Sequence, residues 1–193
     1  MAKTKLSGGW IALIVIGAIV VLGILWFIGS YNGLVRADET VNEKWANVQT
    51  AYQRRADLIP NLVETVKAYS DYEGEVLTQI TEARASIGSA KTPAELQTAG
   101  AELNSALARL LVVVENYPNL KANENYLSLQ DQLEGTENRI KVERDIYNKA
   151  VRDYSIKIRR FPTNIVANMF NFGSRDMFQA EEGAEEAPEV NFD

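Results

Sequence analysis

The sequence predicts an all-α protein, in which an N-terminal transmembrane helix is followed by an elongated up-and-down helical bundle with long helices. Three observations carry this prediction: an uncharged apolar run near the N-terminus, apolar residues that recur every three or four positions, and helix start and stop signals between the periodic segments. We expect an N-terminal tail and anchor over residues 1–30, a bundle over 31–172, and an acidic disordered tail over 173–193.

The first element is the predicted transmembrane helix. The run from Trp10 to Ile28 carries no charge, and as a helix it spans roughly 28 Å, which is the thickness of a bilayer's hydrocarbon core. Trp10 lies at one end, and Trp26 and Tyr31 lie at the other, where amphipathic rings favour the two membrane interfaces. These three residues are the predicted membrane anchor of a single-pass protein.

A cleavable signal peptide is the alternative interpretation, because Lys3 and Lys5 precede the apolar run. The run is longer than a signal peptide's apolar region, however, and no A-x-A cleavage site follows it. For orientation, Lys3 and Lys5 on one side compete with Arg36 and Lys44 on the other. The balance weakly favours the N-terminus inside, and the membrane side of the bundle stays open.

A long amphipathic helix is predicted to continue directly from the membrane segment. Pro60 is expected to interrupt or kink it, and the region Gly88–Lys91 to end it. Its apolar positions follow a heptad-like pattern: Leu34, Val41, Trp45, Val48, Tyr52, Ile59, Leu62, Val66, Tyr69, Val76, Ile80, Ala83 and Ile87.

The membrane-proximal part of this helix is the predicted self-association surface. The continuous helix would be roughly 85 Å long, whereas the next helix reaches only about 36 Å. Either the first helix breaks at Pro60 into two bundle members, or its stripe near the membrane has no partner in the same chain and pairs with another copy. The residues of this stripe are Leu34, Val41, Trp45, Val48 and Tyr52.

Two further helices have clear boundaries. Thr92, Pro93 and Glu95 form a capping-box signature at the start of the second, and Pro118 ends or bends it. The third runs until Phe161-Pro162 stops it. Their predicted buried positions are Leu96, Leu103, Leu107, Leu110 and Val114, then Tyr126, Leu129, Leu133, Thr136, Ile140, Tyr147, Val151, Tyr154 and Ile158.

The segment after Pro162 allows two interpretations. Thr163 can cap a short apolar segment that extends to Phe172. The interpretation that we favour is a short fourth helix that packs back on the bundle. The alternative is an interfacial helix that lies on a membrane or on another copy.

Composition excludes several classes of chemistry. The chain has no Cys and no His, so disulfides, thiolate or imidazole catalysis and N- or S-ligated zinc sites are absent. The net charge of −6 resides in the tail, since Ala180–Asp193 holds six acidic residues and no basic one, and acidic and basic residues balance elsewhere. No basic face for nucleic acid is indicated, and no phosphate-binding or nucleophile motif occurs. We predict no enzymatic activity and no cofactor.

Five stretches together resemble the LemA family: YNGLV at 31–35, YQRRADLIPNLVETVKAY at 52–69, ENYPNLKANENYLSLQDQL at 115–133, TENRIKVERDIYNKAV at 136–151 and IRRFPTNIVA at 158–167. The resemblance covers the chain from the membrane helix to about Phe172 and leaves the acidic tail outside. It implies a bacterial membrane protein with an N-terminal transmembrane helix and a helical bundle. It supplies no catalytic residues.

Polar residues crowd these stretches and form a predicted polar network inside the bundle. We expect Arg and carboxylate side chains from different helices to pair and fix the register of packing. A carboxylate cation site and a hydrolase that uses Asp57 and Glu137 are the weaker alternatives. The network residues are Arg54, Arg55, Asp57, Asn61, Glu115, Asn116, Glu137, Asn138, Arg139 and Arg144, with Asn148 one turn beyond Arg144.

The sequence therefore favours a non-catalytic, self-associating structural or scaffolding component of the membrane. Its expected partners are the lipid bilayer, further copies of the chain in a homo-oligomer, and another membrane protein. The alternative function is an adaptor or regulator of a membrane enzyme, such as a protease or kinase, in which the exposed bundle face and the acidic tail bind the partner.

Overall fold

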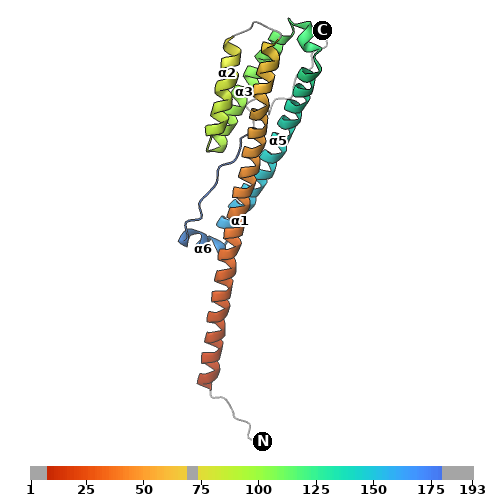
Figure 1. Cartoon of the computed structure of the whole chain (residues 1–193). Coiled ribbons are helices and arrows are strands. Elements are labelled where there is room, and N and C mark those ends of the chain that lie inside the picture. Colours follow the sequence, from red (N-terminus) through yellow and green to blue (C-terminus); the bar gives the residue numbers. More distant parts are fainter. Residues whose placement is uncertain (1–7, 69–73, 180–193) are drawn as a thin grey trace, which may run out of the picture. The chain divides into compact units, whose positions relative to one another are not determined.

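The structure, a computed structural model, describes residues 8–68 and 74–179, and its regular elements there are all α-helices (Figure 1). The predicted all-α class is therefore confirmed. Lys3, Lys5 and the acidic tail from Ala180 lie outside the described residues. The helices are α1 (Gly8–Lys67), α2 (Glu75–Ser89), α3 (Pro93–Val114), α4 (Pro118–Lys121), α5 (Glu124–Arg159) and α6 (Thr163–Met169).

The described residues divide into two compact units. The first takes those of Met1–Asn42 and Arg152–Arg175, and the second takes those of Glu43–Val151 and Asp176–Asp193. Helices α1 and α5 contribute to both units.

Helix α1 passes through Pro60, so the chain does not break there, and of the two alternatives at Pro60 the break is wrong. A proline inside a helix removes a single backbone donor, and here the adjoining turns are held by packing, because Ile59 and Leu62 are almost completely buried. Tertiary burial outweighs the local cost of the proline.

The first break lies instead between Lys67 and Glu75, where α1 ends and α2 begins. The prediction of one helix reaching to residue 87 is therefore wrong, although its apolar positions Val76, Ile80, Ala83 and Ile87 are buried on α2 as expected. This break removes the mismatch in helix length, since α2 is a separate bundle member that packs along α3.

The second unit is an up-and-down bundle, in which the chain reverses direction from α1 to α2, from α2 to α3 and from α3 to α5 (Figure 1). Thr92 begins α3 as predicted, because its hydroxyl accepts a hydrogen bond from the Glu95 N–H at 3.2 Å. The Glu95 carboxylate accepts from the N–H of Lys91 at 2.7 Å, one residue before the position that a standard capping box uses. Asn123 caps α5 by accepting from the N–H groups of Asn125 and Tyr126.

Helices α1 and α3 approach closely where Tyr52 lies against Gly100. A β-carbon added at Gly100 would lie 2.7 Å from Tyr52 Cε1, and the Tyr52 ring is buried. We predict that Gly100→Ala destabilises the bundle by about 1–3 kcal/mol, because overpacking exceeds the gain in helix propensity. Urea denaturation of the full-length protein in mild detergent, followed by circular dichroism, measures the change.

Gly135→Ala on α5 is the matched control, since an added β-carbon there meets nothing within 4 Å. It is expected to stabilise by about 0.5–1 kcal/mol through helix propensity alone. Equal effects of the two substitutions would show that the contact between Tyr52 and Gly100 is not tight.

The first unit contains the apolar span. Helix α1 has a segment long and apolar enough to cross a membrane. Its most apolar 18-residue stretch has a mean hydropathy of 3.1, and none of that stretch is buried. Trp10 and Trp26 are exposed at the two ends of the span, as a membrane-facing helix requires. The chain thus fits a single-pass membrane protein.

Tyr31, the third predicted anchor residue, has protein neighbours. Its ring centroid lies 4.7 Å from that of Phe170 and 6.0 Å from that of Phe172. It belongs to a cluster in which Leu34, Val166 and Ala167 are fully buried. Helix α6 therefore packs back on α1, as favoured from the sequence, but it does so at the end of the membrane span.

Candidate functional site

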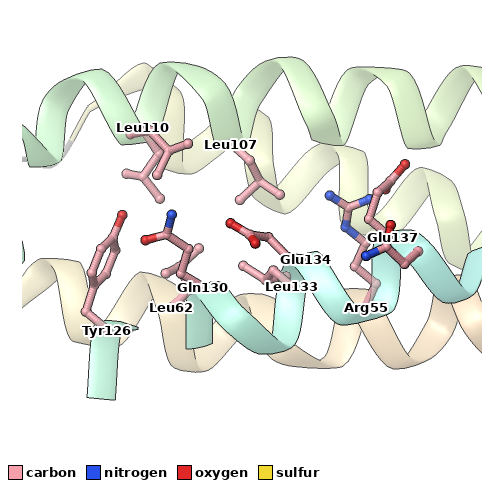
Figure 2. A pocket seen from close by; sticks show the side chains of 11 residues that line it. Arg55, Leu62, Leu107, Leu110, Tyr126, Gln130, Leu133, Glu134 and Glu137 are labelled. Carbon is pink, nitrogen blue, oxygen red and sulfur yellow. The ribbon is translucent and has the colours of Figure 1, made fainter. Parts of the chain in front are cut away.

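A cavity of about 330 Å³ opens among α1, α3 and α5 in the second unit. Leucine side chains from all three helices form its apolar wall, and Figure 2 shows Tyr126 at one end and the pair Arg55 and Glu137 at the other. The lining residues are Arg55, Leu62, Leu107, Leu110, Leu111, Tyr126, Gln130, Leu133, Glu134, Glu137 and Asn138. A mainly apolar cavity with a few polar groups at defined points is typical of a binding site.

The polar end of the cavity is an ion pair between helices. Arg55 on α1 is only 8% exposed and pairs with Glu137 on α5. Burial lowers the pKa of the Arg55 guanidinium, and the nearby Tyr52 opposes this shift. The Nε–H of Arg55 is buried and has no hydrogen-bond partner among the described residues, which adds to the cost of burying this guanidinium.

The arrangement is suited to binding rather than to acid–base chemistry. The partly buried carboxylate of Glu137 is already held by Arg55, and burial raises the pKa of Tyr126 above its ordinary value, which keeps that phenol neutral. Among the described residues, no group of three or more His, Cys, Asp or Glu side chains is placed to hold a metal ion.

The predicted polar network is divided into separate pairs. Arg55 and Glu137 form the expected contact between helices, Arg139 pairs with Glu143 at 2.7 Å, and Asn138 lines the cavity. The remaining positions on α1 and at the end of α3 are exposed and do not join the Arg55 pair: Arg54, Asp57, Asn61, Glu115 and Asn116. Asp57 accepts a hydrogen bond from Gln53 at 2.9 Å, so the structure does not bring Asp57 and Glu137 together as a catalytic pair.

Residues 173–179 were expected to belong to a disordered tail, and this is wrong. Residues 176–179 are extended against the bundle, and Phe178 is 5% exposed. Its ring centroid lies 5.6 Å from Tyr147 and 6.0 Å from Trp45, and the Arg144 guanidinium lies 4.9 Å above it. A single aromatic side chain gives this segment enough apolar burial to dock.

Hydrogen bonds fix the backbone of the same segment. The Asn148 amide accepts from the Phe178 N–H at 2.9 Å and donates to the Phe178 carbonyl at 3.0 Å. Tyr147 donates to the carbonyl of Asp176, and Arg144 donates to that of Gln179. Arg144 and Asn148, predicted to share a face of the helix, therefore hold the segment that leads into the acidic tail.

The stripe predicted to lack a partner is covered by the chain itself. In the first unit Leu34 and Val41 are buried, and Leu34 packs against Val166 and Ala167. In the second unit Val48 and Tyr52 are buried, and Trp45 packs on Tyr147 and Phe178. The reason given for self-association through this stripe is therefore wrong, because the break after Lys67 and the docked segment were not foreseen. Self-association itself remains a prediction.

Two features of the second unit were missed from sequence. Glu143 is 4% exposed although it was not included in the network, and its position three residues after the buried Ile140 was the available signal. Leu111, Val112 and Leu127 are exposed apolar residues, and Leu111 lines the cavity. Two consecutive exposed apolar residues at the end of α3 were the signal for it.

Comparison with known proteins agrees with this architecture. A family model described as the LemA family matches residues 44–192, which includes the acidic tail that the resemblance had left outside. Protein LemA of Metamycoplasma hominis is 28% identical over 170 residues, covering 85% of this chain and 76% of the relative. Magnetosome protein MamQ 2 of Paramagnetospirillum magneticum is 28% identical over 189 residues, covering 82% and 70%. Magnetosome protein MamQ of Magnetospirillum gryphiswaldense is 24% identical over 191 residues, covering 83% and 70%.

Proposed function

Because the chain belongs to the LemA family, we propose that it is a single-pass, non-catalytic membrane scaffold, whose bundle assembles with further copies of itself and with partner membrane proteins. The names of the family and of its relatives are not names of enzymes, which agrees with this proposal. We also propose that the N-terminus lies inside, in line with Lys3 and Lys5.

The observation that carries the proposal is the leucine-walled cavity together with its exposed apolar rim. Leu111 lines the cavity and is 45% exposed, and Val112 and Leu127, which follow the lining residues Leu111 and Tyr126 in the chain, are 65% and 46% exposed. Exposed apolar side chains mark interaction sites, and the occupant that we propose is a leucine or phenylalanine from an amphipathic helix.

Oxidative cross-linking in the membrane tests this surface, because the chain has no native Cys. Full-length Leu127→Cys is expected to form disulfide-linked dimers, since two rims that meet bring the two thiols together. Val142→Cys, which is 51% exposed on α5 and does not line the cavity, is the matched control and is expected to stay monomeric.

Adding Leu111→Glu to Leu127→Cys is expected to abolish the cross-link, because a charge at the cavity wall opposes burial of a partner's apolar side chain. Cross-linking that is equal at residues 127 and 142, or that survives Leu111→Glu, would exclude the cavity rim as the assembly surface.

An adaptor of a partner membrane enzyme is the second candidate. Its support is that residues 176–179 hold the start of the acidic tail at a fixed place on the bundle, so the six acidic residues beyond are presented from a defined point. Deleting residues 180–193 separates the two functions. A scaffold that assembles through the cavity rim keeps its cross-link and its co-purifying proteins, whereas an adaptor loses the proteins and keeps the cross-link.

A further inference from the structure

Helix α6 in the first unit has two apolar faces, and only one of them is covered by protein. Val166 and Ala167 are fully buried against the cluster around Leu34. Four large side chains on or next to the same short helix are exposed, although Phe170 also contacts Tyr31 at the edge of the cluster: Phe161 at 76%, Ile165 at 52%, Met169 at 61% and Phe170 at 45%. We call these four residues the α6 patch.

The α6 patch lies at the end of the membrane span. The ring of Phe170 is 6.0 Å from Phe27 and 4.7 Å from Tyr31, and Phe27 is the penultimate residue of the uncharged run Trp10–Ile28. The patch is therefore continuous with side chains that lie where hydrocarbon gives way to headgroups. Figure 1 shows α6 beside α1 in this unit.

Basic residues lie near the α6 patch in the chain, and their positive charge matches the negative phosphates of lipid headgroups. From Tyr154 to Arg175 the chain carries four basic residues and no acidic one, and of these Arg175 is paired with Asp38 at 2.8 Å. Arg159 and Arg160 are exposed directly before Phe161, and the Lys157 ammonium donates to the Gly33 carbonyl at 3.0 Å, which fixes the end of α5 against α1. Exposed arginines next to an apolar face are typical of segments that lie in the interfacial layer and contact phosphates.

From this geometry we infer that the α6 patch is a second membrane contact, with Phe161, Ile165, Met169 and Phe170 in the boundary between headgroups and acyl chains, and with Arg159 and Arg160 at the phosphates. The lipid surface is the occupant because the patch continues the surface of the membrane span. The chain would then be attached to the bilayer both by α1 and, about 130 residues later, at the end of α5. This contact is independent of the cavity and of the proposed scaffold function.

Depth-dependent fluorescence quenching in lipid vesicles tests the inference. The full-length chain is reconstituted with a single Cys at Ile165→Cys or Met169→Cys, and the thiol is labelled with bimane; no native Cys interferes. The vesicles contain phosphatidylcholine and phosphatidylglycerol, with a nitroxide at a shallow or a deep acyl position. Val142→Cys, also about half exposed, is the matched control on α5.

We expect the shallow nitroxide to quench bimane at residues 165 and 169 about threefold more strongly than at residue 142, and more strongly than the deep nitroxide, because interfacial segments lie about 5–10 Å into the boundary. Quenching equal to that of the control overturns the inference. The inference is also overturned if bimane at residues 165 and 169 is quenched only when the nitroxide is attached to a second copy of the protein. The patch would then be covered by protein and not by lipid.

Discussion

Glu137→Ala is expected to destabilise the bundle by about 3–5 kcal/mol, because it leaves the Arg55 guanidinium buried without its counter-charge. Arg55 already has one buried donor without a partner among the described residues, so loss of the carboxylate adds to an existing cost of burying the guanidinium. Urea denaturation of the full-length protein in mild detergent, followed by far-ultraviolet circular dichroism, gives the free energy of unfolding.

Two further variants separate the ion pair from a general effect at the cavity. Glu134→Ala removes an exposed carboxylate from the same cavity wall, and its effect is expected to stay within about 0.5 kcal/mol. Replacing both partners, as Arg55→Met with Glu137→Leu, is expected to restore stability, since an apolar pair avoids the cost of desolvating two charges. A double variant as unstable as Glu137→Ala would mean that Arg55 and Glu137 stabilise the bundle by more than neutralising each other's charge.

Phe178→Ala is expected to cost about 3–5 kcal/mol and to release residues 176–179 from the bundle, because the Phe178 ring is the only large apolar side chain that the segment buries. Met177→Ala is the matched control, since Met177 is exposed and its truncation is expected to have little effect. Trypsin cleavage after Arg175 should become faster in the Phe178 variant and stay unchanged in the control. An unchanged cleavage rate in Phe178→Ala would show that the hydrogen bonds from Asn148 hold the segment without the ring.

Local signals in the sequence predicted most of the helices correctly. The Thr92, Pro93 and Glu95 signature marked the start of α3, and periodic apolar positions identified the buried faces of α3 and α5. These features depend on neighbours within one or two turns, so a single sequence contains the information.

The features that were missed depend on contacts distant in the chain. Pro60 was given too much weight because the burial of Ile59 and Leu62 is tertiary, whereas the turn-forming residues Ser70, Asp71 and Gly74 were a better sign of the break before α2. Phe178 is recognised by Tyr147 and Asn148 about thirty positions earlier, and nothing near Phe178 in the sequence indicates this docking. The cavity likewise exists only where three helices meet.

These missed contacts change which surface is open to a partner. The stripe from Leu34 to Tyr52 is covered within the chain, whereas the cavity rim at Leu111 and Leu127 is exposed. The proposed scaffold therefore assembles through the bundle surface, and α1 supplies the anchor.

The mass of the full-length protein, extracted from its membrane together with native lipid, tests this account most directly. We predict particles that hold more than one copy of the 21.5 kDa chain, that keep their mass on dilution, and that lose copies when Leu111 is replaced by Glu. A particle that contains a single chain and no other protein at every concentration would contradict the proposed scaffold.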